Sequence, residues 1–560
     1  MAQTAAAPTE RDTASVQEAR TLVQRARLAA PILAEFSQEQ IDRIVDAVAA
    51  AARPRAEEFA KLAVEETGFG VVADKIQKNL FASERVYEFI RPMKTVGVVA
   101  HDEARKIIEI AEPFGVVAAI VPSTNPTSTA IYKILISLKA RCPVVLSPHP
   151  SAAKCITRVA ELLADAARGA GAPEGAVNWM TTVTLAGTQE LMQNRGVAVI
   201  LATGGMGLVR AAYSAGKPAY GVGPGNAPCY IERTADVAKA ANDILTGKSF
   251  DNGVLCSSPN SVVVDAAVAE EAKRQFTAQG GYFLSPAEAD ALAKLLVTPQ
   301  RLPNPQFVGK SAIVIAQALG ITVPANTRAL IAELKGVGRD FPLSIEKLCP
   351  VLSYYVVADW HEGCERCKEI LRYGGMGHTM SIHSENQAVI LEFGLKKPAF
   401  RICVNTPTTH GSIGLTTGLD PALTLGCGGY GGNITSDNIS PKHLLNIKRL
   451  AWELRPAPRA AASAAAPALP KVPKPPAPIG LDASAMTANI ESLTGARPIA
   501  ASKADTGANQ SVATFVCEDD VRHAIKLGRT ITIGDRTIVT PLARDAGDAA
   551  NVFVYANWRA

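Results

Sequence analysis

Strands and helices alternate along the middle of the chain, and this alternation limits the possible folds more than any other feature of the sequence. Short apolar, β-rich runs predict strands at 115–121, 143–147 and 196–202. Apolar residues at helical spacing follow at 152–168 and 206–215. Such alternation is typical of a parallel sheet covered by helices. The sequence therefore predicts an α/β fold.

A second set of apolar runs indicates a second α/β domain. Strands are expected at 260–264, 312–315 and 351–357, again separated by helical patterns. A helical region at 13–90 precedes both sets. With 560 residues the chain is too long for one ordinary core, which agrees with two or three domains.

Composition and charge argue against several classes of partner and site. The net charge is +5 and no run rich in Lys and Arg stands out, so nucleic acid is not expected as a partner. No membrane segment and no export signal are expected, because the apolar stretches are only strand-sized. The ten cysteines are scattered, as is typical of reduced thiols in a cytosolic protein. Cys364 and Cys367 form a CxxC in an expected helix, but nothing completes a zinc set, so no metal site is predicted.

One cysteine lies in a setting suited to chemistry. Cys256, in FDNGVLCSSPN, follows a glycine-containing turn where a helical stretch gives way to a strand. A thiol in such a turn can reach a substrate, and local amides can lower its pKa and so activate it toward an aldehyde. Taken alone, however, the segment favours an inert buried cysteine, which is the usual fate of this residue.

The surrounding motifs reverse that interpretation. FDNGVLCS resembles the nucleophile motif of the aldehyde dehydrogenase family, and three further family motifs occur in order between about residues 13 and 453. Asn125 in VPSTNPTSTAIYK matches the amide that helps to bind the oxyanion. Glu346 in IEKLCPVLS matches the glutamate that contacts the nicotinamide ribose. The turn and helix start beneath the cofactor pyrophosphate are matched by Thr203, Gly204 and Gly205 in ATGGMGLVRAA.

The resemblance implies a Rossmann-type cofactor domain, an α/β catalytic domain and an oligomerisation hairpin. The expected divisions are N-terminal helices with the dinucleotide-binding domain (1–225, hairpin at 95–110), the catalytic domain (226–430), a return strand and helix (431–454), a Pro/Ala linker (455–480), and a targeting helix with a small tail (481–560). Family members assemble through such a hairpin and a late strand, here expected near 432–438. A homodimer or homotetramer is therefore predicted.

The cofactor contacts follow partly from physics and partly from the resemblance. At the TGG turn a strand feeds a helix, whose free N–H groups can hold phosphate where glycine lets the backbone come close. The family places residues near the adenosine ribose where this chain has Ser147 and His149. Hydrolytic members often have a lysine there and an acidic residue soon after, and this chain supplies neither. NAD is therefore favoured over NADP, although the choice stays open.

One departure from the hydrolytic members indicates the reaction. Those enzymes carry a glutamate that activates water, and YGVGPGNAP has Gly221 at the corresponding position. Without that base an acyl-cysteine intermediate survives longer, so a thiol such as coenzyme A can collect the acyl group. GVGPGN is also the form found in CoA-acylating members, including the propionaldehyde and acetaldehyde dehydrogenases of bacterial microcompartments. The resemblance thus implies NAD-dependent oxidation of a short-chain aldehyde to acyl-CoA through a thioester on Cys256.

Two histidines and several alternatives stay open from sequence. His378 in GMGHT is a candidate for the CoA half-reaction, against a structural role in bonding to backbone, and His410 in TTHGS is a weaker candidate. The aldehyde is expected to be propionaldehyde or acetaldehyde, as in propanediol utilisation, with succinate semialdehyde or sulfoacetaldehyde as the alternative. A hydrolytic dehydrogenase and a non-catalytic scaffold are the competing functions.

The end of the chain changes in composition at Arg455. Residues 455–480 are almost all Ala and Pro and are expected to form an extended spacer. An amphipathic helix at 481–495 resembles peptides that load cargo into bacterial microcompartments, so shell proteins are a candidate partner; a tail that packs on its own subunit is the alternative. Beyond it, FVCEDDVRHAIKLG predicts a strand and a capped helix, and ITIGDRTIVTP a hairpin with a Gly-Asp turn. No alcohol dehydrogenase domain is expected, and the predicted location is the bacterial cytoplasm, within a microcompartment if the helix targets it there.

Overall fold

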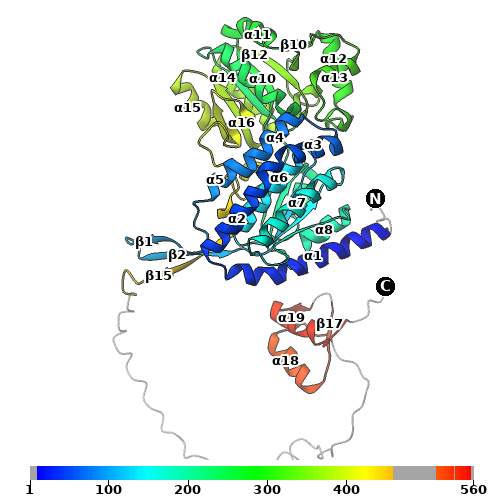
Figure 1. The fold of residues 1–560 in the computed structure, drawn as a ribbon, viewed down its shortest axis with the longest axis vertical. Helices are drawn as coiled ribbons and strands as arrows, with labels where there is room; N and C mark the ends of the chain where they lie inside the picture. The colour runs from blue at the N-terminus through cyan, green and yellow to red at the C-terminus, as the bar shows by residue number, and fades with distance from the viewer. Residues whose placement is uncertain (1–8, 458–511, 535–536, 556–560) are drawn as a thin grey trace, which may run out of the picture. The chain divides into compact units, whose positions relative to one another are not determined.

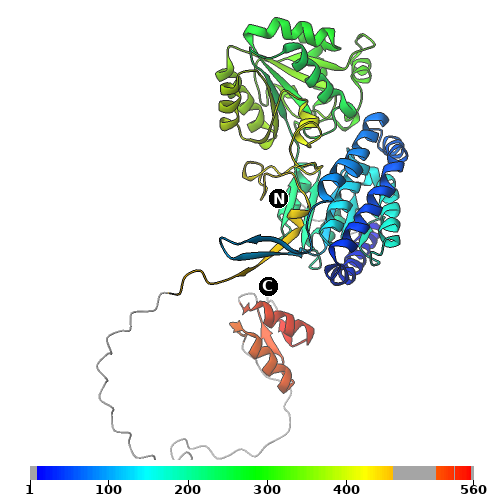
Figure 2. The same ribbon diagram turned by 60° about the vertical axis from the view of Figure 1, so that its left-hand side comes forward.

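A computed structural model describes residues 9–457, 512–534 and 537–555. The chain forms two compact units, Met1–Pro456 and Ala457–Ala560. The helix predicted at 481–495 and most of the predicted linker lie outside the described residues. Figures 1 and 2 show that the first unit has two α/β parts, each with a sheet covered by helices, and a separate small sheet at one side.

Helices open the first unit, each begun by a local signal. Thr9 and Ser37 form capping boxes that begin α1 and α2. The helices are α1 (Glu10–Ala34), α2 (Gln38–Ala52), α3 (Ala56–Thr67), α4 (Val72–Leu80) and α5 (Val86–Ile90). They supply part of the core that covers one face of the first sheet.

The first sheet is parallel, with the strand order β5-β4-β3-β6-β7. Its strands are β3 (Val117–Val121), β4 (Val144–Pro148), β5 (Val177–Trp179), β6 (Val199–Thr203) and β7 (Ala219–Val222), and the connecting helices are α6 (Pro126–Lys139), α7 (Ala153–Gly169), α8 (Leu185–Gln193) and α9 (Met206–Tyr213). Alternate residues of β3 enter different cores: Val117 and Ala119 join one cluster, Ala118 and Ile120 the other. Both faces are therefore buried, as the apolar runs predict.

The second sheet is also parallel and has the order β10-β11-β12-β9-β8-β13-β14. Its strands are β8 (Ala227–Ile231), β9 (Pro259–Asp265), β10 (Gly281–Phe283), β11 (Ala329–Glu333), β12 (Val351–Val357), β13 (Gly377–His383) and β14 (Ala399–Val404). The helices of this part are α10 (Val237–Ser249), α11 (Ala269–Ala278), α12 (Pro286–Leu296), α13 (Ala312–Leu319), α14 (Trp360–Tyr373), α15 (Gln387–Lys396) and α16 (Thr408–Ser412). The change from one sheet to the other falls between β7 and β8.

The strand predicted at 312–315 is wrong. This run is the first turn of α13, which Ser311 caps by accepting a hydrogen bond from the Val314 N–H. Gly320 ends the helix in the left-handed conformation. A short apolar run does not distinguish a strand from a helix, and the caps decide here. The strand of this region is β11.

A small antiparallel sheet extends from the side of the first unit (Figure 2). It has the order β1-β2-β15, formed by the hairpin β1 (Gly97–Asp102) and β2 (Ile107–Pro113) and by β15 (Leu445–Ala451). The strand predicted at 432–438 is wrong, and so is the helix within 431–454. Positive φ angles at Gly428 and Gly432 turn the chain there, and only a short 3₁₀ turn precedes β15.

The second unit is a miniature α/β fold. It contains β16 (Phe515–Val516), α18 (Glu518–Leu527), β17 (Ile531–Ile533), β18 (Ile538–Val539), α19 (Pro541–Ala549) and β19 (Phe553–Tyr555). The predicted hairpin is wrong, because β17 pairs in parallel with β19, and β18 pairs with β16. Val521 of α18 and Ala543 of α19 pack with Val516 and Ile533 of the strands. Because helices connect the strands and share this core, the strands pair in parallel.

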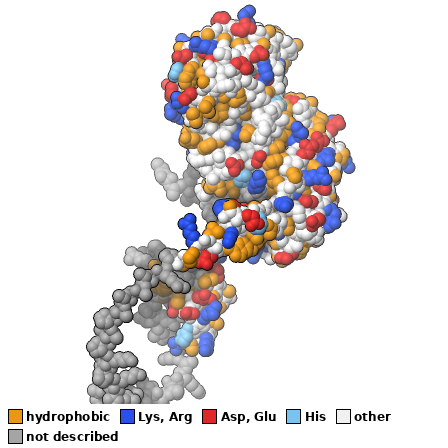
Figure 3. Space-filling model, turned by 90° about the vertical axis from the view of Figure 1, so that its left-hand side faces the viewer, with side chains coloured by type: hydrophobic (Ala, Val, Ile, Leu, Met, Phe, Trp, Pro, Cys, Tyr) orange, Lys and Arg blue, Asp and Glu red, His pale blue; other side chains and the backbone are white. Residues whose placement is uncertain are grey.

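Charged side chains are mixed on the face drawn in Figure 3, where Lys and Arg alternate with Asp and Glu. Among the described helices, none combines the length and apolar character needed to cross a bilayer.

Candidate active site

A cavity of about 460 Å³ opens at the carboxyl ends of the first sheet, where parallel α/β sheets bind their ligands. Strand ends of β3, β4 and β6 form one wall, and the segments that carry Cys256 and Glu346 approach from the other side. The predicted site residues that line it are Asn125, Ser147, His149, Thr203, Gly204, Gly205, Cys256 and Glu346. The structure thus brings into one cavity side chains that the sequence separates by more than two hundred positions.

The end of the cavity at β6 is made of backbone and small groups. Gly205 is the N-cap of α9, and a Cβ added there would meet no atom within 4 Å. The Thr203 hydroxyl has no hydrogen-bond partner among the described residues. A helix start with open space above it and an unpaired hydroxyl beside it fits the pyrophosphate of a dinucleotide.

The neighbouring strand end at β4 contributes two of the predicted ribose contacts. Ser147 is buried, and its hydroxyl shares a 2.9 Å hydrogen bond with Thr188 of α8. His149 follows the strand and accepts a hydrogen bond at Nδ1 from the Ser151 N–H. Both side chains are therefore held by hydrogen bonds within the protein, and both residues line the cavity.

Cys256 lies in the loop between α10 and β9 and is partly exposed toward the cavity. Asp251, Asn252 and Gly253 bend this loop with positive φ angles. Burial, together with the nearby Glu346 charge, raises the pKa of the Cys256 thiol to about 12, although Arg401 opposes the shift. The Cys256 backbone amide lowers this pKa, in the expected direction, but burial outweighs it.

Glu346 is hydrogen-bonded to the GVGPGN segment (221–226), which in turn lies against the loop that carries Cys256. The Gly225 N–H donates to Glu346 Oε1 at 3.0 Å, and burial raises the pKa of this carboxyl to about 8. A Cβ at Gly225 would overlap the Cys256 carbonyl oxygen and would lie 3.3 Å from the His378 ring. Glycine at this position therefore lets the GVGPGN segment lie directly against the Cys256 backbone and the His378 ring.

Gly221, where hydrolytic relatives have their glutamate, faces away from the cavity. A Cβ there would lie 2.8 Å from both the Tyr213 hydroxyl and a Val209 methyl group on α9. The residues that line the cavity begin one position later, at Val222. This backbone leaves no room for a carboxylate at 221.

His378 lies at the start of β13, outside the cavity lining and beside Gly225. Its Nδ1 shares a 2.9 Å hydrogen bond with Thr379, and its Nε2 has no partner among the described residues. Burial and the Arg401 charge lower the pKa of His378 to about 3, so the ring is neutral. With so low a pKa the ring is a weak base, and Nε2 is its one nitrogen without a protein partner among the described residues. His410 of α16, by contrast, packs edge-on against Phe250 and is not among the residues that line the cavity.

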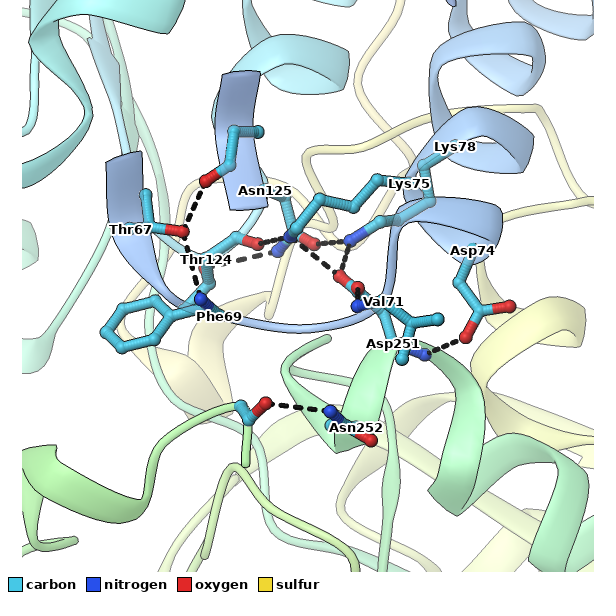
Figure 4. Close-up of polar contacts among 12 residues, drawn as sticks. Thr67, Phe69, Val71, Asp74, Lys75, Lys78, Thr124, Asn125, Asp251 and Asn252 are labelled. Atoms are coloured by element: carbon cyan, nitrogen blue, oxygen red, sulfur yellow. Dashed lines mark hydrogen bonds and ion pairs between the residues drawn. The ribbon is translucent and has the colours of Figure 1, made fainter. Parts of the chain in front are cut away.

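A buried charge cluster beside Asn125 is absent from the sequence prediction (Figure 4). Lys75 and Lys78 of α4 both pair with Asp251, which lies in the loop that leads to Cys256. Their spacing of three in DKIQKN places both on one helix face, but such a pattern usually marks a solvated surface. Within the described residues, no three or more His, Cys, Asp and Glu side chains gather as a metal set.

The family comparison places this geometry among known proteins. The sequence model of the aldehyde dehydrogenase family matches residues 3–280. The chain is 43% identical over 442 residues to the bifunctional aldehyde-alcohol dehydrogenase of Escherichia coli K12, covering 78% of this chain and 50% of that protein. It thus spans about half the length of that curated relative. It is 36% identical to the acetylating succinate-semialdehyde dehydrogenase of Clostridium kluyveri, with 77% and 95% covered.

Solved structures agree with these relatives. An acetylating aldehyde dehydrogenase from Geobacillus thermoglucosidasius is 48% identical, with a TM-score of 0.79, and the match covers 80% of this chain and 99% of that one. A propionaldehyde dehydrogenase from Rhodopseudomonas palustris, solved with bound CoA and an acylated cysteine, is 27% identical with a TM-score of 0.71, covering 78% and 97%.

Proposed function

The chain belongs to the aldehyde dehydrogenase family, and from this premise we propose that it converts a short-chain aldehyde to acyl-CoA with NAD as oxidant. The main support is that Cys256 lines the same cavity as the helix start at Gly205. Position 221 points toward α9 and places no side chain in this cavity. A base aimed at water is the feature that would favour hydrolysis.

In the first half-reaction the Cys256 sulfur attacks the aldehyde carbon, and its thiol proton passes to water in the open cavity. The Asn125 amide donates a hydrogen bond to the oxyanion that forms, in the manner of an oxyanion hole. A bound nicotinamide dinucleotide supplies the hydride acceptor. Thr203, Gly204 and Gly205 would hold its pyrophosphate, Ser147 and His149 would lie toward the adenosine ribose, and Glu346 would lie toward the nicotinamide ribose; all six residues line the cavity. The product on the protein is a thioester of Cys256.

In the second half-reaction the neutral His378 ring takes the thiol proton of CoA at Nε2. The CoA thiolate then attacks the thioester carbon, the carbon–sulfur bond to Cys256 breaks, and acyl-CoA is released. The Cys256 thiolate takes the proton back from His378, which restores the starting enzyme. The free Nε2 and its place beside Gly225 support this role. The relative that was solved with CoA and an acylated cysteine supports the same order of events.

Propionaldehyde or acetaldehyde is the proposed substrate. Succinate semialdehyde is a second candidate, because the Clostridium kluyveri relative is named for that substrate. A carboxylate substrate needs a free cation, and Arg401, the guanidinium whose charge acts on Cys256, already donates to the carbonyls of Gly377, His378, Gly426 and Ser436. This engagement favours the uncharged aldehydes.

Assembly is proposed to use the small sheet of β1, β2 and β15 as part of a dimer or tetramer. Val98 and Leu450 of this sheet are about half exposed, at 53% and 50%. Location in a bacterial cytoplasm, with docking to microcompartment shell proteins through 481–495, is proposed on the resemblance of that segment alone.

The test is NADH formation from a panel of aldehydes, with and without CoA, and with the products identified by mass spectrometry. We expect steady turnover to acyl-CoA only when CoA is present and a single burst of NADH without it. Free acid formed at the full rate without CoA would show a hydrolytic enzyme instead. A panel that contains succinate semialdehyde and sulfoacetaldehyde ranks the substrate classes by kcat/KM.

A further inference from the structure

We propose that Lys78 is a positioning residue for the reaction: it sets which way the Asn125 amide faces and anchors that amide to the loop that carries Cys256. The proposal rests on the proposed function and adds a residue of helix α4 to it. Figure 4 shows the groups involved, which come from α4, from the start of α6 and from the Cys256 loop.

The contact between Lys78 and Asn125 is direct. Lys78 Nζ donates to Asn125 Oδ1 at 2.6 Å and also pairs with Asp251. The Lys78 and Asp251 side chains are 2% and 0% exposed, so water cannot replace either partner. Burial lowers the pKa of Lys78 to about 7, while the Asp251 charge opposes that shift.

The chemistry of lysine fixes the orientation of the amide. A lysine side chain offers hydrogen-bond donors, whereas an asparagine side chain offers an oxygen acceptor on one side and an NH₂ donor on the other. With Oδ1 held by Lys78, Nδ2 faces the other way and donates to Thr124 Oγ1 at 3.2 Å. Asn125 and Thr124 both line the cavity. An oxyanion needs a donor, so the flipped amide would present the wrong atom. A cation on the amide oxygen also polarises the group and strengthens its N–H as a donor.

The same cluster holds the loop of the nucleophile. Asp251 Oδ1 accepts from the Val71 N–H at 2.7 Å, and the Asp251 N–H donates to Asp74 at 2.7 Å. These bonds fix Asp251 in its positive φ conformation, five residues before Cys256. One face of α4 therefore connects the oxyanion donor to the turn that presents the sulfur.

Lys75 shows why Lys78 has a separate role. Lys75 pairs with Asp251 at 3.0 Å and donates to the Thr124 carbonyl, but its contacts do not include the Asn125 side chain. It is as buried as Lys78 and has the same side chain. If charge balance for Asp251 were the whole purpose, one lysine would supply it. Replacing either lysine removes one ion-pair partner of Asp251. Replacing Lys78 also removes the donor to the Asn125 amide, and replacing Lys75 does not.

The experiment measures the presteady-state rate of NADH formation and KM in the full-length enzyme. We expect Asn125→Ala to slow the rate by about 10²-fold, as loss of one oxyanion donor does. We expect Lys78→Met to slow it by roughly tenfold or more with little change in KM for NAD, because the amide becomes free to turn. Lys75→Met should show a clearly smaller loss. Lys139→Met, which breaks the buried pair with Asp42 away from the cavity, should keep the wild-type rate.

A double-mutant cycle separates positioning from folding. If Lys78 acts through Asn125, the double variant is about as slow as Asn125→Ala alone. Losses that multiply, or a Lys78→Met rate equal to that of Lys139→Met, would overturn the inference. If Lys78→Met does not fold, Lys78→Leu, which also removes the donor, takes its place with the same criteria. Lys78→Gln, which keeps a donor without the charge, should lose less rate than either variant. A wild-type enzyme that forms no acyl-CoA would instead overturn the proposed function.

Discussion

The two ends of the cavity are built differently. At the cofactor end, Gly204, Gly205 and the strand end at Ser147 offer backbone groups, small side chains and open space. At the sulfur end, buried polar groups are bound to specific partners: Lys78 donates to Asn125, and the Gly225 N–H donates to Glu346. The cofactor end therefore depends on open space for its ligand, and the sulfur end depends on hydrogen bonds between particular side chains.

This difference predicts opposite sensitivities. Adding atoms should damage the cofactor end, because the space itself is the binding feature. Removing or exchanging groups should damage the sulfur end, because each buried polar group leaves a partner unsatisfied. The predictions below test this contrast, from the largest expected effect to the smallest.

Cys256→Ala should abolish NADH formation, by at least about 10⁴-fold, because no other nucleophile takes its place. Tryptophan fluorescence titration with NAD should give an unchanged Kd, since the cofactor end keeps all its groups. Residual turnover close to the wild-type rate would show that the nucleophile is assigned to the wrong residue.

His378→Gln should slow acyl-CoA formation by about 10²-fold or more, the usual contribution of a general base. The burst of NADH without CoA should stay near the wild-type rate, because the first half-reaction does not use this ring. Stopped-flow absorbance at 340 nm with a CoA quench separates the two steps. An equal loss in both steps would give His378 a structural role.

Gly205→Ala should raise KM for NAD by about tenfold, which corresponds to roughly 1.4 kcal/mol of binding. The φ angle of −66° at Gly205 suits alanine, so the added methyl group would act only by filling the space where phosphate binds. Gly207→Ala is the matched control, because a Cβ there also meets no atom within 4 Å but does not border the cavity. Similar KM values for both variants would contradict a phosphate site at this helix start.

Glu346→Gln should change how stability depends on pH. Burial raises the pKa of Glu346 from 4.5 to about 8, so the folded protein keeps a proton that the unfolded chain releases. Stability is therefore lost as pH rises from about 4.5 through 8, and the variant should escape this loss. Thermal unfolding at pH 5 and pH 8 should show Tm of the variant gaining roughly 1–3 °C on the wild type at the higher pH. Parallel Tm values would show that the carboxyl is not kept neutral.

Sequence predicted the parts of this molecule that depend on local pattern. The two parallel sheets follow from apolar runs such as 115–121, and motif order located the residues that line one cavity. The run at 312–315 failed because four apolar residues fit a helix as well as a strand, and Ser311 and Gly320 settle the matter. The tail hairpin failed because pairing in parallel depends on helices packed between the strands.

The lysine cluster was beyond sequence for a physical reason. Lys75 and Lys78 look like an ordinary solvated face of α4, and only a partner 173 positions away, at Asp251, makes their burial possible. Long-range charge pairs of this kind leave no local pattern. The Pro/Ala composition of 455–480, by contrast, indicates a spacer without reference to any partner.

The antiparallel pairing of β15 with β2 has a consequence for synthesis of the chain. Arg449 and Glu109 face each other across this pair although 340 positions separate them. On the ribosome, β2 leaves the exit tunnel with one edge paired to β1 and the other edge open, and it keeps that open edge until β15 has been translated. At typical elongation speeds this interval is on the order of tens of seconds. Nascent chains with an open strand edge associate readily, so chaperone supply and expression temperature should govern the yield of active enzyme.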